Sequence, residues 1–238
     1  MKNDAEKVWC IIPAAGVGKR MLTDCPKQYL PFQGSTILDV TIDRLLSCNK
    51  IVKIVVCLHA DDENWQHSLY CENDRVIRSI GGAERADTVL NGIETLSSYA
   101  GDSDWVLVHD AARPCVRLSD IHTLINVAIE KQQGAILAAP IHDTVKEVVD
   151  GVVHKTLERT VLWRALTPQL FKINQLQGAL IAAKNDSILI TDEASAIEHI
   201  NESVLVVEGS ADNIKITLPK DLELANFYIN KQEEEICA

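Results

Sequence analysis

The chain has 238 residues, of which 47% are hydrophobic, enough for one large domain with a buried core. Its 34 acidic and 23 basic residues give a formal net charge of −11, which argues against binding nucleic acid through a broad basic face. No segment approaches the ~20 consecutive apolar residues of a membrane span, and the apolar part of the N-terminus is too short for a signal peptide, so we expect neither.

The cysteines favour a reducing compartment. They are seven in number, an odd count, and no two are spaced as Cys-x-x-Cys. This pattern predicts free thiols rather than a disulfide framework, and we therefore expect a cytoplasmic protein. The positions are Cys10, Cys25, Cys48, Cys57, Cys71, Cys115 and Cys237.

The first predicted element is a buried strand, 8–13, and the loop after it indicates an anion site. The loop is built from small residues up to Gly18 and carries three cations, Lys19, Arg20 and Lys27. Small residues let backbone N–H groups approach a ligand closely, and neighbouring cations suit a polyanion. We therefore predict a phosphate-rich ligand, the alternative being an ordinary turn with incidental surface charges.

Two common phosphate-binding loops do not match. A Walker loop needs four residues between its first glycine and a Gly-Lys pair, whereas only Val17 separates Gly16 from Gly18. A dinucleotide fingerprint needs a third glycine where Met21 stands. An NAD-dependent dehydrogenase is therefore disfavoured.

The next elements alternate between helix and strand. This rhythm predicts βαβ units: an α/β, Rossmann-like, doubly wound and mostly parallel sheet with helices on both faces. The predicted elements are helix 36–46, strand 51–58, helix 61–70, strand 75–80, helix 84–98, strand 105–109, helix 119–132 with Ser119 as N-cap, and strand 135–141.

The rhythm is interrupted after residue 141. Apolar runs at 144–149 and 152–157 flank Asp150-Gly151, a strong hairpin signal, and predict a projecting β-arm over 142–160. The predicted elements after it are helices 175–184 and 192–200, strands 204–208 and 213–217, a helix from Pro219 and a solvated tail, 231–238. We treat 1–238 as one domain with this arm.

Ligands of open parallel sheets bind beyond the carboxyl ends of the strands, and four segments meet there: the Gly16 loop, Gly81-Gly82, 109–114 and the turn after Pro140. The glycine pair can admit a flat ligand such as a base, with Thr88 adding a hydroxyl, although a glycine pair also suits a plain tight turn.

Charged side chains on this rim have two readings each. Asp110 can hold a ribose hydroxyl or a divalent ion, or can pair with Arg113 or cap a helix. His109 should point elsewhere, because side chains alternate along a strand. Lys215 lies in a predicted strand, and Arg159 and Lys146 lie on the predicted hairpin. For all three the alternative is an ordinary solvent-exposed side chain.

Eight motifs in order give a resemblance. They are Pro13-Ala14-Ala15-Gly16-x-Gly18-x-Arg20, Pro26-Lys27-Gln28-Tyr29, Gly81-Gly82-x-Glu84-Arg85, His109-Asp110-Ala111-Ala112-Arg113-Pro114, Asp143-Thr144-x-Lys146, Leu166-Thr167-Pro168-Gln169, Thr191-Asp192-Glu193-Ala194 and Asp212-Asn213-Ile214-Lys215. Over roughly residues 8 to 230 the chain resembles the 2-C-methyl-D-erythritol 4-phosphate cytidylyltransferases, nucleotidyltransferases of non-mevalonate isoprenoid synthesis that use CTP.

The resemblance implies a division of roles. Arg20 and Lys27 match the catalytic pair at the α-phosphate of CTP, and Arg159 and Lys215 match the catalytic residues that position the methylerythritol phosphate. Nucleotide-binding positions are Pro13, Ala14, Ala15, Gly16, Gly18, Lys19, Gly82, Thr88, Asp110 and Ala111. Substrate-binding positions are Arg113, Thr144, Thr167, Thr191 and Thr217.

The resemblance also implies a homodimer in which each arm enters the neighbour's site, so that Thr144 and Arg159 act there. One position departs from the family pattern: Ala83 stands where the family often has aspartate. The implied reaction is a direct displacement without a general base, with Mg²⁺ bridging the nucleotide phosphates and Asp110 as the best protein candidate beside the metal.

Two other functions stay open on the sequence. A ribitol 5-phosphate cytidylyltransferase would have the same fold and chemistry, but that group tends to carry valine where Ala112 stands. A nucleotide-binding regulatory protein without turnover would have no need of four cations for a transition state.

Overall fold

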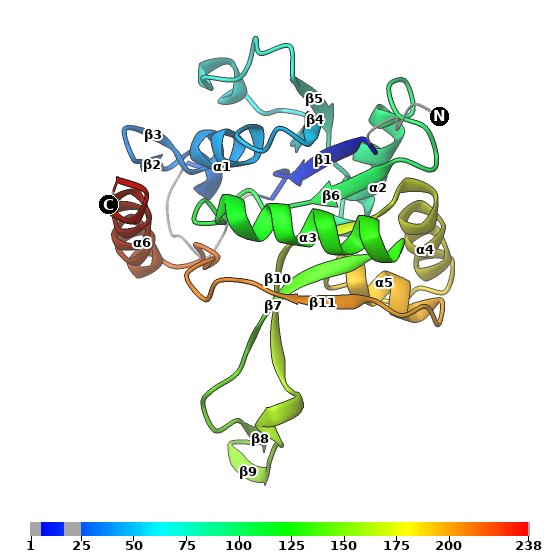
Figure 1. The fold of residues 1–238 in the computed structure, drawn as a ribbon, viewed down its shortest axis with the longest axis vertical. Coiled ribbons are helices and arrows are strands. Elements are labelled where there is room, and N and C mark those ends of the chain that lie inside the picture. Colours follow the sequence, from blue (N-terminus) through cyan, green and yellow to red (C-terminus); the bar gives the residue numbers. More distant parts are fainter. Residues whose placement is uncertain (1–5, 17–24, 238) are drawn as a thin grey trace.

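The structure is a computed structural model that describes residues 6–16 and 25–237. A seven-stranded sheet forms its centre, with the strand order β11-β7-β10-β6-β1-β4-β5 (Figure 1). Its strands are β1 (Val8–Pro13), β4 (Ile51–Leu58), β5 (Val76–Ile80), β6 (Trp105–Val108), β7 (Ala135–Pro140), β10 (Trp163–Lys172) and β11 (Leu205–Glu208). All neighbouring pairs are parallel except those of β10, which is antiparallel to β6 and β7.

Helices cover both faces of the sheet, which confirms the predicted doubly wound α/β fold. One apolar cluster joins the sheet to α1 (Ile37–Leu46) and α3 (Leu118–Lys131). The opposite cluster joins it to α2 (Arg85–Leu96), α4 (Ile173–Asn185) and α5 (Glu193–His199). The central strands are buried on both faces, as their nearly continuous apolar sequence requires.

A third, smaller cluster holds the C-terminal helix α6 (Pro219–Cys237) against the small hairpin of β2 (Pro31–Phe32) and β3 (Ser35–Thr36). Helix α6 therefore runs through the tail as far as Cys237, and the tail is solvated as predicted except at Gln232: Lys231, Glu233, Glu234 and Glu235 are exposed. Gln232 is buried and donates to the Cys115 carbonyl oxygen at 2.9 Å, while Glu235 pairs with Arg117 at 2.6 Å. Such long-range partners are invisible in a polar, Glu-rich sequence.

Two predicted elements are absent. In place of helix 61–70 only a 3₁₀ turn, Trp65–His67, forms. Asp62 Oδ1 accepts hydrogen bonds from the backbone N–H groups of Asn64 and Trp65, and such a side chain competes with helix formation. In place of strand 213–217 the chain forms an irregular loop.

Neither the small β2–β3 hairpin nor one strand of the central sheet was predicted from the sequence. β10 carries Pro168 in its interior, which argues locally against a strand, and its register shifts between Ala165 and Gln169 so that the proline is accommodated. The N-cap of α3 is Arg117, not Ser119, which lies inside the first turn.

The predicted β-arm is present between β7 and β10. It consists of β8 (Lys146–Val149) and β9 (Val152–Thr156), and a 3₁₀ turn, Arg159–Val161, follows it. Asp150 and Gly151 have φ of 50° and 79°, the left-handed geometry that two-residue hairpins favour. Figure 1 shows the arm extending from the sheet away from the helices.

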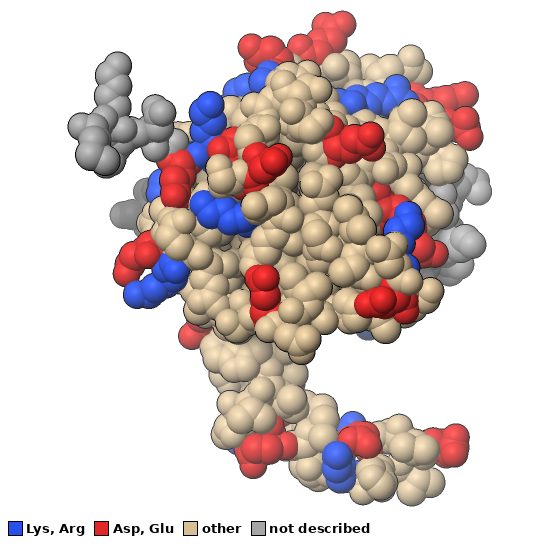
Figure 2. Space-filling model, turned by 90° about the vertical axis from the view of Figure 1, so that its right-hand side faces the viewer, with Lys and Arg blue, Asp and Glu red and all other residues tan. Residues whose placement is uncertain are grey.

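The surface carries both basic and acidic side chains, as the charged residues of the sequence lead one to expect. On the face drawn in Figure 2, Lys and Arg are interspersed with Asp and Glu, and the arm stands clear of the body. The six cysteines with described side chains, at 10, 25, 48, 57, 71 and 115, are free thiols, as predicted. Within residues 6–16 and 25–237, no helix combines the length and apolarity needed to cross a membrane.

Candidate active site

The carboxyl ends of β1, β5 and β6 enclose a cavity of about 320 Å³. Strands β4 and β5 follow on one side of β1, and the next strand, β6, lies on the other side. The cavity lies at this reversal of the strand order, where open parallel sheets bind ligands. Three of the four segments predicted for the rim line it; the fourth, the turn after Pro140, leads into the arm instead. The lining residues are Pro13, Ala14, Ala15, Gly16, Lys27, Gln28, Gly82, Ala83, Glu84, Arg85, Thr88, Asp110, Ala111, Ala112 and Lys215.

The small-residue loop is anchored through its backbone. Ala14 N–H donates to the Cys57 carbonyl oxygen at 2.8 Å, and the buried Gln28 amide donates to the Ala14 carbonyl oxygen at 2.8 Å. Next to Gln28, the Lys27 ammonium lies 3.3 Å from the Ile216 carbonyl oxygen, which places it at the cavity beside Lys215. The predicted contacts Gly18, Lys19 and Arg20 lie outside the described residues.

The glycine pair lets two loops approach each other. A Cβ atom on Gly81 would lie 2.4 Å from the Ala15 Cβ atom, so only glycine fits. Gly82 N–H donates to the Thr88 hydroxyl at 3.0 Å, and that hydroxyl donates to the Glu84 carbonyl oxygen at 3.0 Å. Thr88 lines the cavity as predicted, but its hydroxyl is engaged in shaping this turn.

A second cavity, of about 230 Å³, adjoins the first, and Arg85, Asp110 and Lys215 line both. Three residues predicted for the sugar phosphate, Arg113, Thr167 and Thr191, line this second cavity. Its other lining residues are Ala165, Leu166, Gln169 and Asp192. The two cavities thus share a wall made of one carboxylate and two cations.

Asp110 is the centre of that wall. Its Oδ2 lies 2.9 Å from Lys215 Nζ and 3.2 Å from Arg113 Nε, and its Oδ1 lies 3.5 Å from Arg85 Nη2. Burial by itself raises the pKa of this carboxyl, but the charges of Arg85, Lys215 and Arg113 outweigh burial and hold the pKa well below its usual range. The side chain is therefore an anion at any physiological pH.

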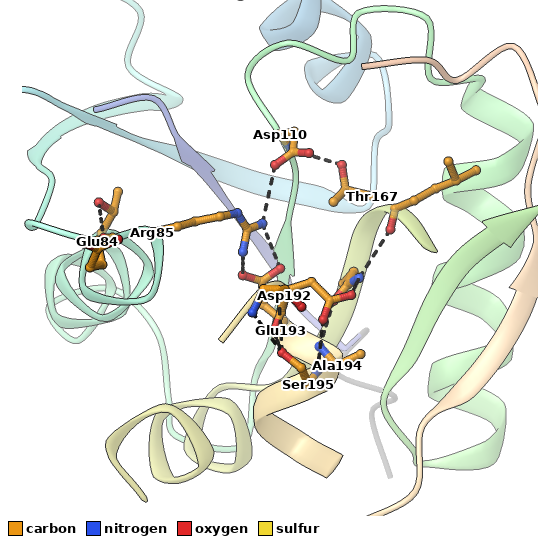
Figure 3. A network of polar contacts seen from close by, with 12 residues as sticks. Glu84, Arg85, Asp110, Thr167, Asp192, Glu193, Ala194 and Ser195 are labelled. Carbon is orange, nitrogen blue, oxygen red and sulfur yellow. Dashed lines mark hydrogen bonds and ion pairs between the residues drawn. The ribbon is translucent and has the colours of Figure 1, made fainter. Parts of the chain in front are cut away.

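Sequence reasoning missed the partner on the far side of Arg85. Glu193, at the start of α5, is 1% exposed and forms two contacts with the Arg85 guanidinium, one of them at 3.0 Å (Figure 3). Burial lowers the pKa of Arg85, yet Glu193 and Asp110 raise it above its ordinary value. The motifs that contain Arg85 and Glu193 were evident in the sequence, but nothing in it indicated that they pair.

His109 turns away from the cavities, as strand alternation predicts. It is fully buried, with Nε2 3.0 Å from the Arg113 carbonyl oxygen and Nδ1 3.1 Å from the Thr167 hydroxyl. Burial lowers the pKa of His109 to about 4, so the ring is neutral at pH 7 and forms part of the scaffold.

Of the predicted site residues that the structure describes, three line neither cavity. Thr217 lies two residues before the start of α6, and its N–H and hydroxyl both donate to Asp221 Oδ2 at 2.9 Å. Thr144 and Arg159 belong to the exposed arm, where the Arg159 guanidinium donates to the His142 carbonyl oxygen at 2.7 Å.

The described residues offer no ready-made metal centre. In residues 6–16 and 25–237, no three His, Cys, Asp or Glu side chains group as metal ligands do. Asp110, the predicted candidate, has its oxygens among three cations. Its surroundings suit a hydrogen-bond acceptor better than a direct metal ligand.

Comparisons with known proteins point to one family. The family model of 2-C-methyl-D-erythritol 4-phosphate cytidylyltransferase matches residues 8–231. A protein of that name from Vibrio atlanticus is 47% identical over 98% of this chain and 100% of its own length, and one from Vibrio parahaemolyticus is 48% identical over 98% and 99%. The crystal structure of the Francisella tularensis 2-C-methyl-D-erythritol 4-phosphate cytidylyltransferase superimposes with a TM-score of 0.82 at 39% identity, covering 93% of this chain and 99% of that one.

Proposed function

The chain belongs to the 2-C-methyl-D-erythritol 4-phosphate cytidylyltransferase family, and we propose that its two adjoining cavities hold the two substrates of that reaction. The enzyme transfers CMP from CTP to 2-C-methyl-D-erythritol 4-phosphate, giving 4-diphosphocytidyl-2-C-methyl-D-erythritol and pyrophosphate in non-mevalonate isoprenoid synthesis. In the proposal, the nucleotide occupies the cavity at Pro13–Gly16 and Gly82, and the polyol phosphate occupies the cavity at Arg113, Thr167 and Thr191.

The shared wall is the observation that carries this proposal. Arg85, Asp110 and Lys215 line both cavities, so ligands in the two cavities would meet at this wall. A transfer between two phosphates needs this adjacency, because the attacking oxygen must reach the α-phosphorus in line with the leaving group.

The chemistry we propose is one displacement. A phosphate oxygen of the polyol phosphate attacks the α-phosphorus of CTP, a new P–O bond forms, and the bond to the β-phosphate oxygen breaks as pyrophosphate leaves. A phosphate monoester is largely dianionic at neutral pH, since its second pKa is near 6, so no protein base has to remove a proton. The neutral, buried His109 fits a mechanism that does not use it.

Catalysis then depends on positively charged side chains that lie beside the reacting phosphates. Lys215 would position the polyol phosphate and Lys27 would face the α-phosphate, where charge develops in the transition state. From the family resemblance, Arg20 would accompany Lys27, and Lys19 and Gly18 would contact the nucleotide phosphates. Asp110 would accept a hydrogen bond from the ribose while keeping Lys215 and Arg113 in place.

We include Mg²⁺ as cofactor. The nucleotide phosphates and water would hold it, since the described residues supply no ligand cluster, and bound there it would neutralise phosphate charge. Chelation with EDTA is expected to abolish product formation, and excess Mg²⁺ to restore it. Full activity of EDTA-treated protein with metal-free CTP would contradict this part of the proposal.

We also propose that the protein acts as a homodimer through its arm. An isolated two-stranded hairpin is marginally stable, and this one exposes an apolar surface that needs a partner. The exposed side chains are Val148, Val149, Val152, Val153 and Val161. A second copy of the chain would cover them and receive Thr144 and Arg159 in its own site.

The decisive test offers CTP with each of two acceptors and measures pyrophosphate release. We expect release with 2-C-methyl-D-erythritol 4-phosphate and little with ribitol 5-phosphate, since Ala112 follows the family pattern. Preference for ribitol 5-phosphate would overturn the acceptor. Tight CTP binding without release from either would instead favour a regulatory protein.

A further inference from the structure

We propose that Glu193 and Arg85 form a positioning pair that fixes the Asp110 carboxylate, and through it Lys215, between the two cavities. This inference rests on the function proposed above and adds two residues to it. Arg85 entered that function only as part of the shared wall and Glu193 not at all, although both belong to motifs of the sequence.

The geometry gives Arg85 two carboxylate partners on opposite sides. Arg85 is the first residue of α2, and its guanidinium engages both oxygens of Glu193, with Nη2 at 3.0 Å from Oε2. The same Nη2 lies 3.5 Å from Asp110 Oδ1. Figure 3 shows this guanidinium between the two carboxylates, a fork geometry that a planar, multiply donating group can satisfy and a lysine cannot.

Glu193 itself is held rigidly. The buried Gln169 of β10 accepts from the Ala194 N–H at 2.9 Å and donates to Asp192 Oδ2 at 2.9 Å. Asp192 and Ser195 cap the start of α5 with reciprocal hydrogen bonds. Because both neighbours of Glu193 are tied to the sheet, its carboxylate is a fixed point for Arg85.

The charges indicate what the pair does. The ion pairs join two carboxylates, Asp110 and Glu193, to three cations, Arg85, Arg113 and Lys215. The Asp192 carboxylate, which lines the second cavity, adds a further negative charge near Arg85. Loss of the Glu193 charge makes the cluster more positive by one charge and releases Arg85 to follow the phosphate. The polyol phosphate would then bind at least as tightly but in a less productive position.

Glu193 lines neither cavity, so its effect must pass through Arg85. This separates a positioning role from direct substrate contact. It also makes Glu193→Gln a clean probe, because the amide keeps the size of the side chain and loses only its charge and one of its acceptor atoms.

The experiment compares the wild-type dimer with Glu193→Gln, Arg85→Lys and the double variant. Pyrophosphate release gives kcat and KM, and calorimetry gives binding of CTP and of the polyol phosphate. Glu198→Gln, an exposed residue of the same helix, is the matched control. We expect kcat of Glu193→Gln to fall about tenfold, within the range for a misplaced reacting group, with unchanged or tighter polyol phosphate binding.

The double variant decides whether the two residues act as a unit. Its loss in kcat should match that of the more impaired single variant, because residues of one unit are not additive. Turnover of Glu193→Gln within twofold of wild type, additive losses, or reduced binding stoichiometry for CTP would each overturn the pair. If wild-type protein forms no product, the proposed function fails instead, and weaker polyol phosphate binding by Glu193→Gln than by wild type would then overturn the pair separately.

Discussion

At the scale of single residues, the site depends on a short hydrogen-bond chain behind Asp110. Asp110 N–H donates to the Thr167 hydroxyl at 3.1 Å, which leaves the hydroxyl proton to donate to His109 Nδ1. His109 Nε2–H in turn donates to the Arg113 carbonyl oxygen. This chain needs a neutral imidazole, because a proton on Nδ1 would face the hydroxyl proton of Thr167.

The buried histidine should make folding stability fall in mild acid. Burial lowers the pKa of His109 to about 4 from 6.5, so between these values the unfolded chain binds a proton that the folded chain does not. The stability is therefore fully present above pH 6.5 and is lost as the pH falls toward 4. We expect His109 to account for about 2 kcal/mol of loss between pH 7.5 and 5.

Urea denaturation at both pH values tests this. In His109→Gln the loss on acidification should shrink by about 2 kcal/mol relative to wild type. The exposed His142→Gln should leave it unchanged. An equal acid loss in wild type and His109→Gln would show that His109 is not the titrating group.

A second residue-scale prediction concerns the cations at the α-phosphate. Lys27→Ala should lower kcat on the order of 10²–10³-fold, the effect of losing one charge-stabilising donor, and Arg20→Ala should do the same. Lys131→Ala, which removes an exposed lysine on α3, is the control. Steady-state pyrophosphate release measures the effect, and near wild-type turnover in Lys27→Ala would remove that residue from the mechanism.

At the scale of elements, the cavity proposed for the nucleotide exists because two turns touch. The turn after β5 meets the loop after β1 at Gly81 and Ala15, and Gly81 N–H is fixed to the Leu58 carbonyl oxygen at 2.8 Å. Neither turn can retreat easily, since the loop after β1 continues a buried central strand and the turn after the edge strand β5 is held by this hydrogen bond. The close approach therefore sets the width of the cavity.

Gly81→Ala should damage both stability and CTP binding. Its Cβ atom would lie 2.4 Å from that of Ala15, a contact that requires the backbone to shift. Overpacking of this kind costs about 1–3 kcal/mol, measured by urea denaturation, and calorimetry should show weaker CTP binding. Gly178→Ala, in open space on α4, should be neutral or stabilising, as is usual within a helix. Unchanged CTP affinity in Gly81→Ala would show that this contact does not set the width of the cavity.

At the scale of the whole molecule, two residues implied by the family resemblance lie far from the proposed site of their own chain. Thr144 and Arg159 lie on the arm and line neither cavity, although they match family positions at the sugar phosphate. A dimer with exchanged arms would bring them to a partner's cavity. This arrangement predicts that lesions in the body and in the arm complement each other.

Mixing inactive Lys27→Ala and Arg159→Ala protomers should therefore restore activity. A hybrid dimer holds one site with both lesions and one site with none, so random exchange gives about a quarter of wild-type activity. The measurement is pyrophosphate release after subunit exchange, with exchange verified by differently tagged chains. Exchange without recovery would mean that each chain supplies its own Arg159.

The sequence alone determined the α/β architecture, the arm and the residues around the nucleotide cavity. These depend on local signals: continuous apolar runs for buried strands, helical periodicity, Asp-Gly at a hairpin, and small residues at strand ends. The predictions of helix 61–70 and strand 213–217 were wrong, and strand β10 was missed. Asp62 accepts local hydrogen bonds that compete with a helix, Ile216 N–H donates to the carbonyl oxygen of the distant Ala112, and a register shift admits Pro168 into β10.

Only the tertiary structure decided how the charges are paired. Arg85 and Glu193 are 108 positions apart, and Asp110 and Lys215 are also far apart in the sequence. No local pattern selects among the many possible ion pairs of a chain with 57 charged residues, 34 acidic and 23 basic. Packing the strand ends together selects these pairs, because a buried carboxylate is stable only where cations from other elements reach it.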